Sequence, residues 1–219
     1  MQNVKNTMLI WLLRGLAPHP CLSCGVIGGV LCQRCKSDIL DAWIDRCIDC
    51  TAPKGCAHAA IGWVSYVFER DGFVSDMLNG YKFKYQQDTA ALFSELLAPL
   101  VSRDAVLVAI PTIQAHIRQR GFDHNLALVQ AIARRTGCSY TRPLIRTNTV
   151  VMHHLNKADR ATASDNLFIC VETLNPTQRY VLVDDVYTTG ATLRAARHAL
   201  RAAGARNIRA VVLARQPLD

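Results

Sequence analysis

Two adjacent carboxylates, Asp184 and Asp185, follow an apolar run at residues 181–183 and precede small hydroxyl residues around a glycine. Adjacent acids repel each other and are costly to bury, so a chain that only had to fold would not need them. At the end of a strand, they can accept hydrogen bonds from hydroxyl groups or help to hold a divalent cation. The pattern therefore predicts a ligand site at this point of the chain.

The residues after the two acids predict an anion site, which we call the phosphate loop. We expect a turn into a helix here, which offers backbone N–H groups, hydroxyl groups and a helix N-terminus. Gly190 has no Cβ, so the backbone can approach a ligand closely at this point. A ligand with a phosphate at one end and a diol with a metal at the other would fit, as a phosphorylated ribose does. The phosphate loop consists of Thr188, Thr189, Gly190, Ala191 and Thr192.

Two other interpretations of this stretch stay open. A strand–turn–helix with a threonine cap and an acid that favours the helix dipole would explain one carboxylate, although two are harder to explain in this way. A phosphate-accepting receiver domain also has paired acids at a strand end. In that class of protein the pair lies near the start of the domain, whereas here it lies near the end.

Three CxxC pairs precede residue 60, in the runs CLSC, CQRC and CIDC. Two such pairs can hold one zinc ion in a tetrahedral site, and a full set of thiolates leaves no position for water, so the zinc would be structural. A disulfide framework is the alternative, which fits poorly with a chain that lacks a secretory signal. The predicted ligands are Cys21, Cys24, Cys32 and Cys35 for a first site, and Cys47, Cys50, Cys56 and His58 for a second.

The second zinc site has an alternative of its own. The run CAH is not a CxxC pair, and His58 could instead be a surface residue. The sequence thus predicts either one or two zinc ions in this part of the chain.

The composition and the periodicity of the sequence change near residue 60. Residues 1–60 are rich in Cys and Gly, and we expect an N-terminal helix followed by a double zinc ribbon. From residue 61, strand-like and helix-like patterns alternate, which predicts an α/β domain with a central parallel sheet over residues 61–219. The predicted strands are 61–69, 105–111, 167–171, 180–184 and 208–214, the predicted helices are 72–85, 90–100, 126–135 and 190–203, and the polar segment 116–125 is predicted to be a loop.

Composition restricts the class of protein. The chain is 50% hydrophobic and 19% charged, which suits a globular protein with a substantial core, and its net charge of +8 favours phosphate-bearing partners. No segment is long enough to span a bilayer, and the short apolar start leads into CLSC without a cleavage site. We therefore expect no membrane insertion and a cytoplasmic location.

The run LVDDVYTTGATL closely resembles the motif of type I phosphoribosyltransferases, which bind phosphoribosyl pyrophosphate. Together with the cysteine pairs, the chain resembles the ComF family, in which a double zinc ribbon precedes a phosphoribosyltransferase domain. The resemblance extends over residues 12–214. It includes the runs LAPHPCLSC, YKFKY, IRQRGFDHN, LNKADRATASDN and GATLRAARHALRAAGA.

The resemblance implies roles for individual residues in binding phosphoribosyl pyrophosphate and magnesium. Asp184 and Asp185 would face the ribose hydroxyls and magnesium, and the phosphate loop would hold the 5-phosphate. Lys82 would lie near the pyrophosphate and, with magnesium, stabilise it as it departs. The other residues that the resemblance assigns are Arg118, Arg120 and Gly121, in a mobile loop over the site, and Arg160, in a later motif.

Two functions follow from the resemblance. The first is a phosphoribosyltransferase, linked to natural competence and DNA uptake, with single-stranded DNA and a competence helicase or other DNA-processing protein as partners. The alternative is a protein that binds a ribose phosphate or single-stranded DNA without turnover. Asp123, His124, His153 and His154 depart from the residues usual in relatives, which concerns the acceptor side of the site.

Several polar residues are predicted to lie outside the site. No partner spacing supports the histidines as ligands. The arginines of the last helix recur at helical spacing, which is typical of a solvated face, with a nucleic-acid-binding stripe as the alternative. These residues are His116, His124, His153 and His154, and Arg194, Arg197 and Arg201.

Overall fold

The computed structural model describes residues 20–21, 23–27, 31–53, 56, 58, 62–70, 72–83, 86–147 and 167–216. The predicted N-terminal helix lies outside the described residues, as do His153, His154 and Arg160. The chain separates into two compact units, Met1–Ala42 and Trp43–Asp219. The third cysteine pair therefore belongs to the second unit, whereas the sequence predicts a boundary near residue 60. Within the described residues, no helix is both long and apolar enough to cross a bilayer.

The first unit contains a short bridge and one described helix. Pro20 pairs with Ile27 in an isolated antiparallel bridge. Helix α2 (Gln33–Asp41) begins directly after Cys32, and Cys35 is buried in its first turn. The unit therefore builds its described structure around cysteines.

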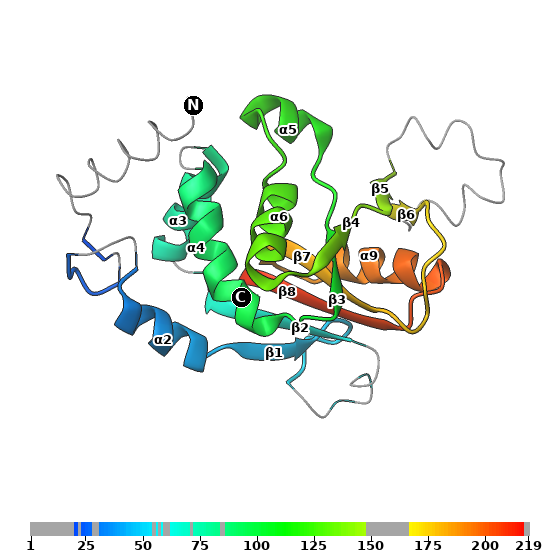
Figure 1. Ribbon diagram of the computed structural model, residues 1–219, viewed down its shortest axis with the longest axis horizontal. Helices are drawn as coiled ribbons and strands as arrows, with labels where there is room; N and C mark the ends of the chain where they lie inside the picture. Colours follow the sequence, from blue (N-terminus) through cyan, green and yellow to red (C-terminus); the bar gives the residue numbers. More distant parts are fainter. Residues whose placement is uncertain are drawn as a thin grey trace. The chain divides into compact units, whose positions relative to one another are not determined.

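The second unit is built on a six-stranded sheet with the order β1-β2-β8-β7-β3-β4 (Figure 1). All neighbours are parallel except β1, which pairs antiparallel with β2. This confirms the predicted α/β class with a mostly parallel sheet. The strands are β1 (Ile44–Cys47), β2 (Trp63–Glu69), β3 (Ala105–Ala109), β4 (Ser139–Thr141), β7 (Arg179–Tyr187) and β8 (Asn207–Arg215).

Helices cover both faces of this sheet. Helices α4 and α6 pack on each other and contact β3, β7 and β8, while α9 contacts β7. Tyr180 and Leu182 share a core cluster with Leu193 and Leu200 of α9, so the alternation of side chains turns Val181 towards the other face. The helices are α3 (Gly72–Phe83), α4 (Gln86–Leu97), the 3-10 turn η1 (Ala98–Leu100), α5 (Gln114–Arg120), α6 (His124–Thr136) and α9 (Ala191–Ala202).

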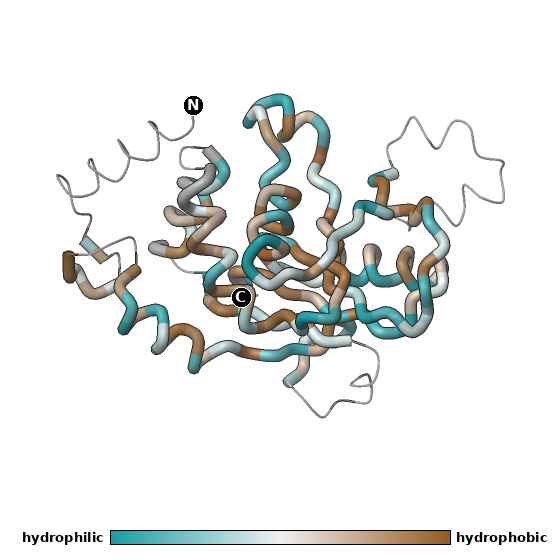
Figure 2. The backbone as a smooth tube through the Cα atoms, in the orientation of Figure 1, coloured by the Kyte–Doolittle hydropathy of each residue, from teal (hydrophilic) through white to brown (hydrophobic). Residues whose placement is uncertain are grey.

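The central strands supply the hydrophobic core. Hydrophobic residues concentrate in these strands (Figure 2). In β7 every residue from Tyr180 to Asp185 is buried. A strand that is buried on both faces is expected between two helical layers, because neither face meets water. It follows that the carboxyl groups of Asp184 and Asp185 lie in the core.

Two sequence predictions need correction. The segment 116–125 is not a loop: it contains most of α5 and the start of α6. Its glycine and its acid are helix-end residues, because Gly121 has φ 80° at the C-cap of α5 and Asp123 accepts the N–H of Leu126 as the N-cap of α6. The predicted strand 167–171 is present as β6 (Phe168–Cys170), but it pairs with β5 (Leu144–Arg146) in a separate two-stranded sheet.

Candidate functional site

The two aspartates lie where β7 extends beyond its neighbour. The pairing of β3 ends at Ala109 opposite Val183, and Ile110 then donates its N–H to the Val183 carbonyl at 3.1 Å. On the other side β8 stays paired with β7. Asp184 and Asp185 are 8% and 7% exposed. They are therefore buried at the carboxyl edge of the sheet, where parallel sheets bind ligands.

Asp185 is held by two positively polarised groups. Lys82, at the end of α3, forms an ion pair with Asp185 Oδ2, and His124 Nε2 lies 3.6 Å from the same oxygen. Burial alone would raise the pKa of Asp185, but hydrogen bonding to His124 and the charge of Lys82 outweigh burial and lower this pKa. Asp185 is therefore the ionised member of the pair.

Asp184 has a different environment. Asn125 Nδ2 donates to Asp184 Oδ1 at 2.8 Å and to the Ile110 carbonyl at 3.1 Å. Burial, together with the charge of Asp185, raises the pKa of Asp184 to about 7. The Oδ1 atom of Asn125 is buried and accepts no hydrogen bond from the described residues. Asn125 Oδ1 is thus an unused acceptor next to Asp184, and either a donor or a hard cation could use it.

The phosphate loop has the geometry of a helix start with unused amides. The N–H groups of Thr188, Thr189 and Gly190 have no acceptor within the described part of the chain, and that of Ala191 makes only a 3.4 Å contact with Thr189 Oγ1. Thr188 and Thr189 are exposed, while Thr192 is half-buried in the first turn of α9. An anion could therefore reach this turn from solvent.

Gly190 is needed for a reason that the sequence did not show. Its φ is 77°, and a Cβ at this position would lie 2.8 Å from the Tyr187 ring and 2.9 Å from Arg194 Nη1. Tyr187 itself is 1% exposed, and its hydroxyl has no partner among the described residues. The close approach at Gly190 is thus made by the protein's own side chains.

The residues predicted on α5 are only partly connected to this site. Arg120 Nη1 lies 3.2 Å from His124 Nδ1, so Arg120 reaches Asp185 through the imidazole ring. Arg118 is exposed, and none of the contacts of the described residues joins it to the acids. Gly121 ends α5, and a Cβ there would meet nothing within 4 Å. Arg160 belongs to the part of the chain that the structure does not describe.

Sequence reasoning missed His124 and Asn125, and it misjudged two arginines. For His124 and Asn125, the signal in the sequence was Asp123, a typical N-cap residue. It places both of them in the first turn of α6, and the start of this helix meets β7. Arg194 and Arg197 do not form a solvated face, because Arg194 donates to the Thr189 carbonyl and Arg197 pairs with Asp49.

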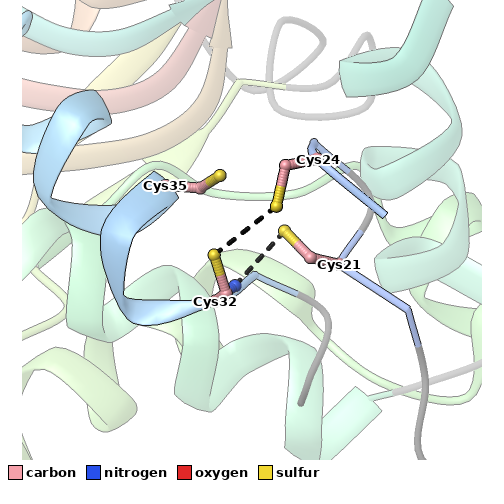
Figure 3. A group of neighbouring side chains, drawn as sticks. All are labelled: Cys21, Cys24, Cys32 and Cys35. Atoms are coloured by element: carbon pink, nitrogen blue, oxygen red, sulfur yellow. Dashed lines mark hydrogen bonds between the residues drawn. The ribbon is translucent and has the colours of Figure 1, made fainter. Parts of the chain in front are cut away.

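The eight predicted zinc ligands form two clusters. In each cluster, one ligand atom from each residue lies within 4.8 Å of the others. Figure 3 shows the first cluster, in which Cys24 Sγ lies 3.7 Å from Cys32 Sγ and the Cys32 N–H donates to Cys21 Sγ at 3.3 Å. The clusters are Cys21, Cys24, Cys32 and Cys35, and Cys47, Cys50, Cys56 and His58.

The first pair of each cluster lies on the same kind of turn. The residue after the second cysteine has a positive φ and donates its N–H to the carbonyl of the first: Gly25 to Cys21 at 2.7 Å, and Thr51 to Cys47 at 3.0 Å. The first cysteine of each pair also donates its N–H to the carbonyl of the residue five positions later: Cys21 to Val26, and Cys47 to Ala52.

Backbone N–H groups favour the thiolate form of one cysteine in each cluster, whereas neighbouring thiols raise the pKa of Cys35 to about 12 and burial raises that of Cys56 to about 11. The Cys32 amide is the main cause that lowers the pKa of Cys21 to about 6, and the Ala52 amide lowers the pKa of Cys50 to about 7. Thiolates are the form that binds zinc. Four sulfur atoms in the first cluster, and three sulfurs with one imidazole in the second, are both common sets for structural zinc. Each cluster could therefore hold one structural zinc ion.

Comparison with known proteins gives two sequence relatives, one of which matches over nearly the whole chain. The chain is 26% identical to competence protein ComFC of Streptococcus pneumoniae over 98% of its length, which covers 96% of that protein. It is 27% identical to competence protein ComFC of Bacillus subtilis over 61% of its length, which covers 56% of that protein. Residues 147–219 match the phosphoribosyl transferase domain family.

Solved structures are similar over a smaller part. The glutamine phosphoribosylpyrophosphate amidotransferase of B. subtilis, complexed with ADP and GMP, has a TM-score of 0.44 and 20% identity; 61% of this chain and 30% of that chain are covered. A structure of the allosteric regulatory enzyme of purine biosynthesis has a TM-score of 0.43, 18% identity, and coverage of 61% and 29%. The sequence relatives and the domain match support the assignment of this chain to the ComF family, with a phosphoribosyltransferase-type domain.

Proposed function

We propose that this chain binds phosphoribosyl pyrophosphate with magnesium at the carboxyl edge of its sheet, and that it acts in natural competence and DNA uptake. One observation carries the proposal. Within seven residues of β7 and its turn, two buried carboxylates are followed by backbone amides without acceptors in the described residues. The name of the two relatives, competence protein ComFC, supports the link to competence.

The two halves of the site would bind opposite ends of the ligand. A phosphate suits the phosphate loop, because free N–H groups and a helix N-terminus favour negative charge. The orphan hydroxyl of Tyr187 lies against Gly190, 3.2 Å from the position of a Cβ there, and adds a donor at the same turn. The carboxylates suit hydroxyl groups of a ribose, which can donate to Asp184 and Asp185.

The oxygen atoms at this edge of the sheet suit magnesium. Asp184, Asp185 and the orphan Oδ1 of Asn125 are hard oxygen ligands of the kind that magnesium prefers. Bound magnesium would neutralise negative charge on the pyrophosphate. Lys82 is held by Asp185 in this structure, so it can turn to a pyrophosphate only when that carboxylate takes another positive partner.

Calorimetric titration with phosphoribosyl pyrophosphate and magnesium tests the proposal. Asp184→Asn combined with Asp185→Asn should weaken binding by at least about tenfold, because each hydrogen bond to a charged group contributes about 1.5–3 kcal/mol. The matched control is Asp104→Asn. Asp104 is an exposed acid that pairs with Arg179 and has no contact with the two aspartates among the described residues. Circular dichroism establishes that the variants are folded. Equal affinity in the double variant and the control would contradict the site.

The first candidate activity for this site is a phosphoribosyltransferase, and a binding protein without turnover is the second candidate. The net charge of +8 and the exposure of Arg118 favour a further polyanionic partner such as single-stranded DNA. The two candidates differ in pyrophosphate release from the sugar pyrophosphate, measured with nucleobases or single-stranded DNA as acceptors. Release supports the transferase, whereas binding without release under every acceptor supports the second candidate. The link to competence predicts that loss of the gene lowers transformation frequency, and that the double aspartate variant does not restore it.

A further inference from the structure

The turn of the second cysteine cluster is packed against the helix that follows the phosphate loop. Ile48, between Cys47 and Cys50, is fully buried in the core cluster that contains Leu193 and Ala196 of α9. The next residue, Asp49, forms an ion pair with Arg197 of α9, and these side chains are only 21% and 11% exposed. The cluster and α9 therefore share one piece of core within the second unit.

One guanidinium joins the cluster turn to the phosphate loop itself. Arg194 Nη1 donates to the Thr189 carbonyl at 2.8 Å, and the same nitrogen lies at 3.5 Å from the Ile48 carbonyl. A Cβ at Gly190 would lie only 2.9 Å from this nitrogen, so the guanidinium packs directly against the phosphate loop. A carbonyl of the phosphate loop is thus tied, through one side chain, to the carbonyl between two candidate zinc ligands.

We propose that Arg194 is a positioning residue through which the second cluster, when it holds zinc, sets the conformation of the phosphate loop. Zinc fixes the turn at Cys47 and Cys50, because a tetrahedral site fixes the positions of its ligands. The turn then presents Ile48 and Asp49 to α9. Arg194 then fixes the orientation of the Thr189 carbonyl through their hydrogen bond, and this leaves the amides of the phosphate loop directed towards solvent. The first cluster lies in the other compact unit, so this proposal concerns the second cluster alone.

The functional part of this inference rests on the proposed sugar pyrophosphate site. The test uses the full chain and calorimetric titration with phosphoribosyl pyrophosphate and magnesium. Cys50→Ser breaks the second cluster, and Arg194→Met removes the link while leaving the cluster intact. Each should weaken binding about tenfold, and the two together should weaken it no more than either alone, because both act through one contact. Arg201→Met, on the same helix, is the matched control and should stay within about twofold.

Arg194→Lys separates positioning from simple charge. A lysine keeps the positive charge, but it lacks the planar guanidinium whose Nη1 lies against Gly190 while it contacts both carbonyls. Affinity in this variant should fall nearly as far as in Arg194→Met. Full affinity in Arg194→Lys, or effects of Cys50→Ser and Arg194→Met that multiply, would overturn the proposal.

Hydrogen exchange gives a readout that does not need the ligand. In the zinc-loaded protein, Arg194→Met should raise amide exchange over residues 188–197, and Cys50→Ser should raise it over the same segment. If the wild-type chain does not bind the sugar pyrophosphate, the proposed function fails, while this exchange pattern still supports the coupling. Unchanged exchange in Arg194→Met overturns the coupling whatever the ligand proves to be.

Discussion

Replacing Lys82 with methionine should destabilise the protein through the carboxylate that Lys82 leaves behind. Removing one partner of a fully buried ion pair costs about 3–5 kcal/mol, because the other charge stays buried without compensation. Here the side chains of Lys82 and Asp185 are 21% and 10% exposed, and His124 Nε2 remains 3.6 Å from the carboxylate. Water and the imidazole therefore offset part of the loss, and we expect about 2 kcal/mol.

Thermal unfolding at neutral pH measures this effect. For a chain of this size, about 2 kcal/mol corresponds to a fall in Tm of about 4–8 °C. Adding Asp185→Asn to Lys82→Met should restore most of the stability, since it removes the uncompensated charge and keeps the shape of the side chain. The matched control is Arg135→Met, which removes an exposed positive charge from α6. A stable Lys82→Met protein, or a double variant no more stable than the single one, would refute the reasoning.

Three further predictions concern the pair of aspartates, the phosphate loop and the two cysteine clusters. Because the pKa of Asp184 is raised to about 7 and a cation competes with the proton, affinity for magnesium and the sugar pyrophosphate should rise from about pH 6 to about pH 8, and calorimetry on Asp184→Asn should show a flatter profile. Gly190→Ala should lower the free energy of unfolding by about 1–3 kcal/mol through strain and contact with Tyr187; Gly137→Ala, also left-handed at φ 79° but without a neighbour within 4 Å, should show the strain alone in urea unfolding. Elemental analysis should find about two zinc ions per chain, and Cys24→Ser and Cys50→Ser should each lose one; a folded wild-type chain without zinc would rule out both sites.

The sequence predicted the parts of the fold whose patterns are local. Two nearly continuous apolar runs among the predicted strands indicated a parallel sheet, because strands that are covered on both faces are largely apolar. The CxxC spacing likewise predicted the first cysteine cluster and the Cys47 and Cys50 half of the second, since two cysteines three residues apart can point to one centre. In each case the information lies within a few consecutive residues.

The missed features depend on contacts between distant segments. β1 and β4 are only 4 and 3 residues long, and their pairing partners make them strands. His124 was judged an ordinary residue, because nothing near it in the sequence shows that the start of α6 meets Asp185. Arg194 and Arg197 have the spacing of a solvated face, and only the cysteine turn, which lies 146 and 148 residues away from them, makes them structural.

Strand β1 decides where this chain can be shortened. It pairs along β2 from Ile44 opposite Tyr66 to Cys47 opposite Trp63. It thereby covers the edge of β2 that would otherwise be unpaired. A protein that began at residue 61 would leave the N–H and C=O groups of β2 open to pairing with another copy, which invites aggregation. A protein that began at Trp43 would keep that edge covered. Attempts to obtain the sheet alone should therefore retain the third cysteine pair.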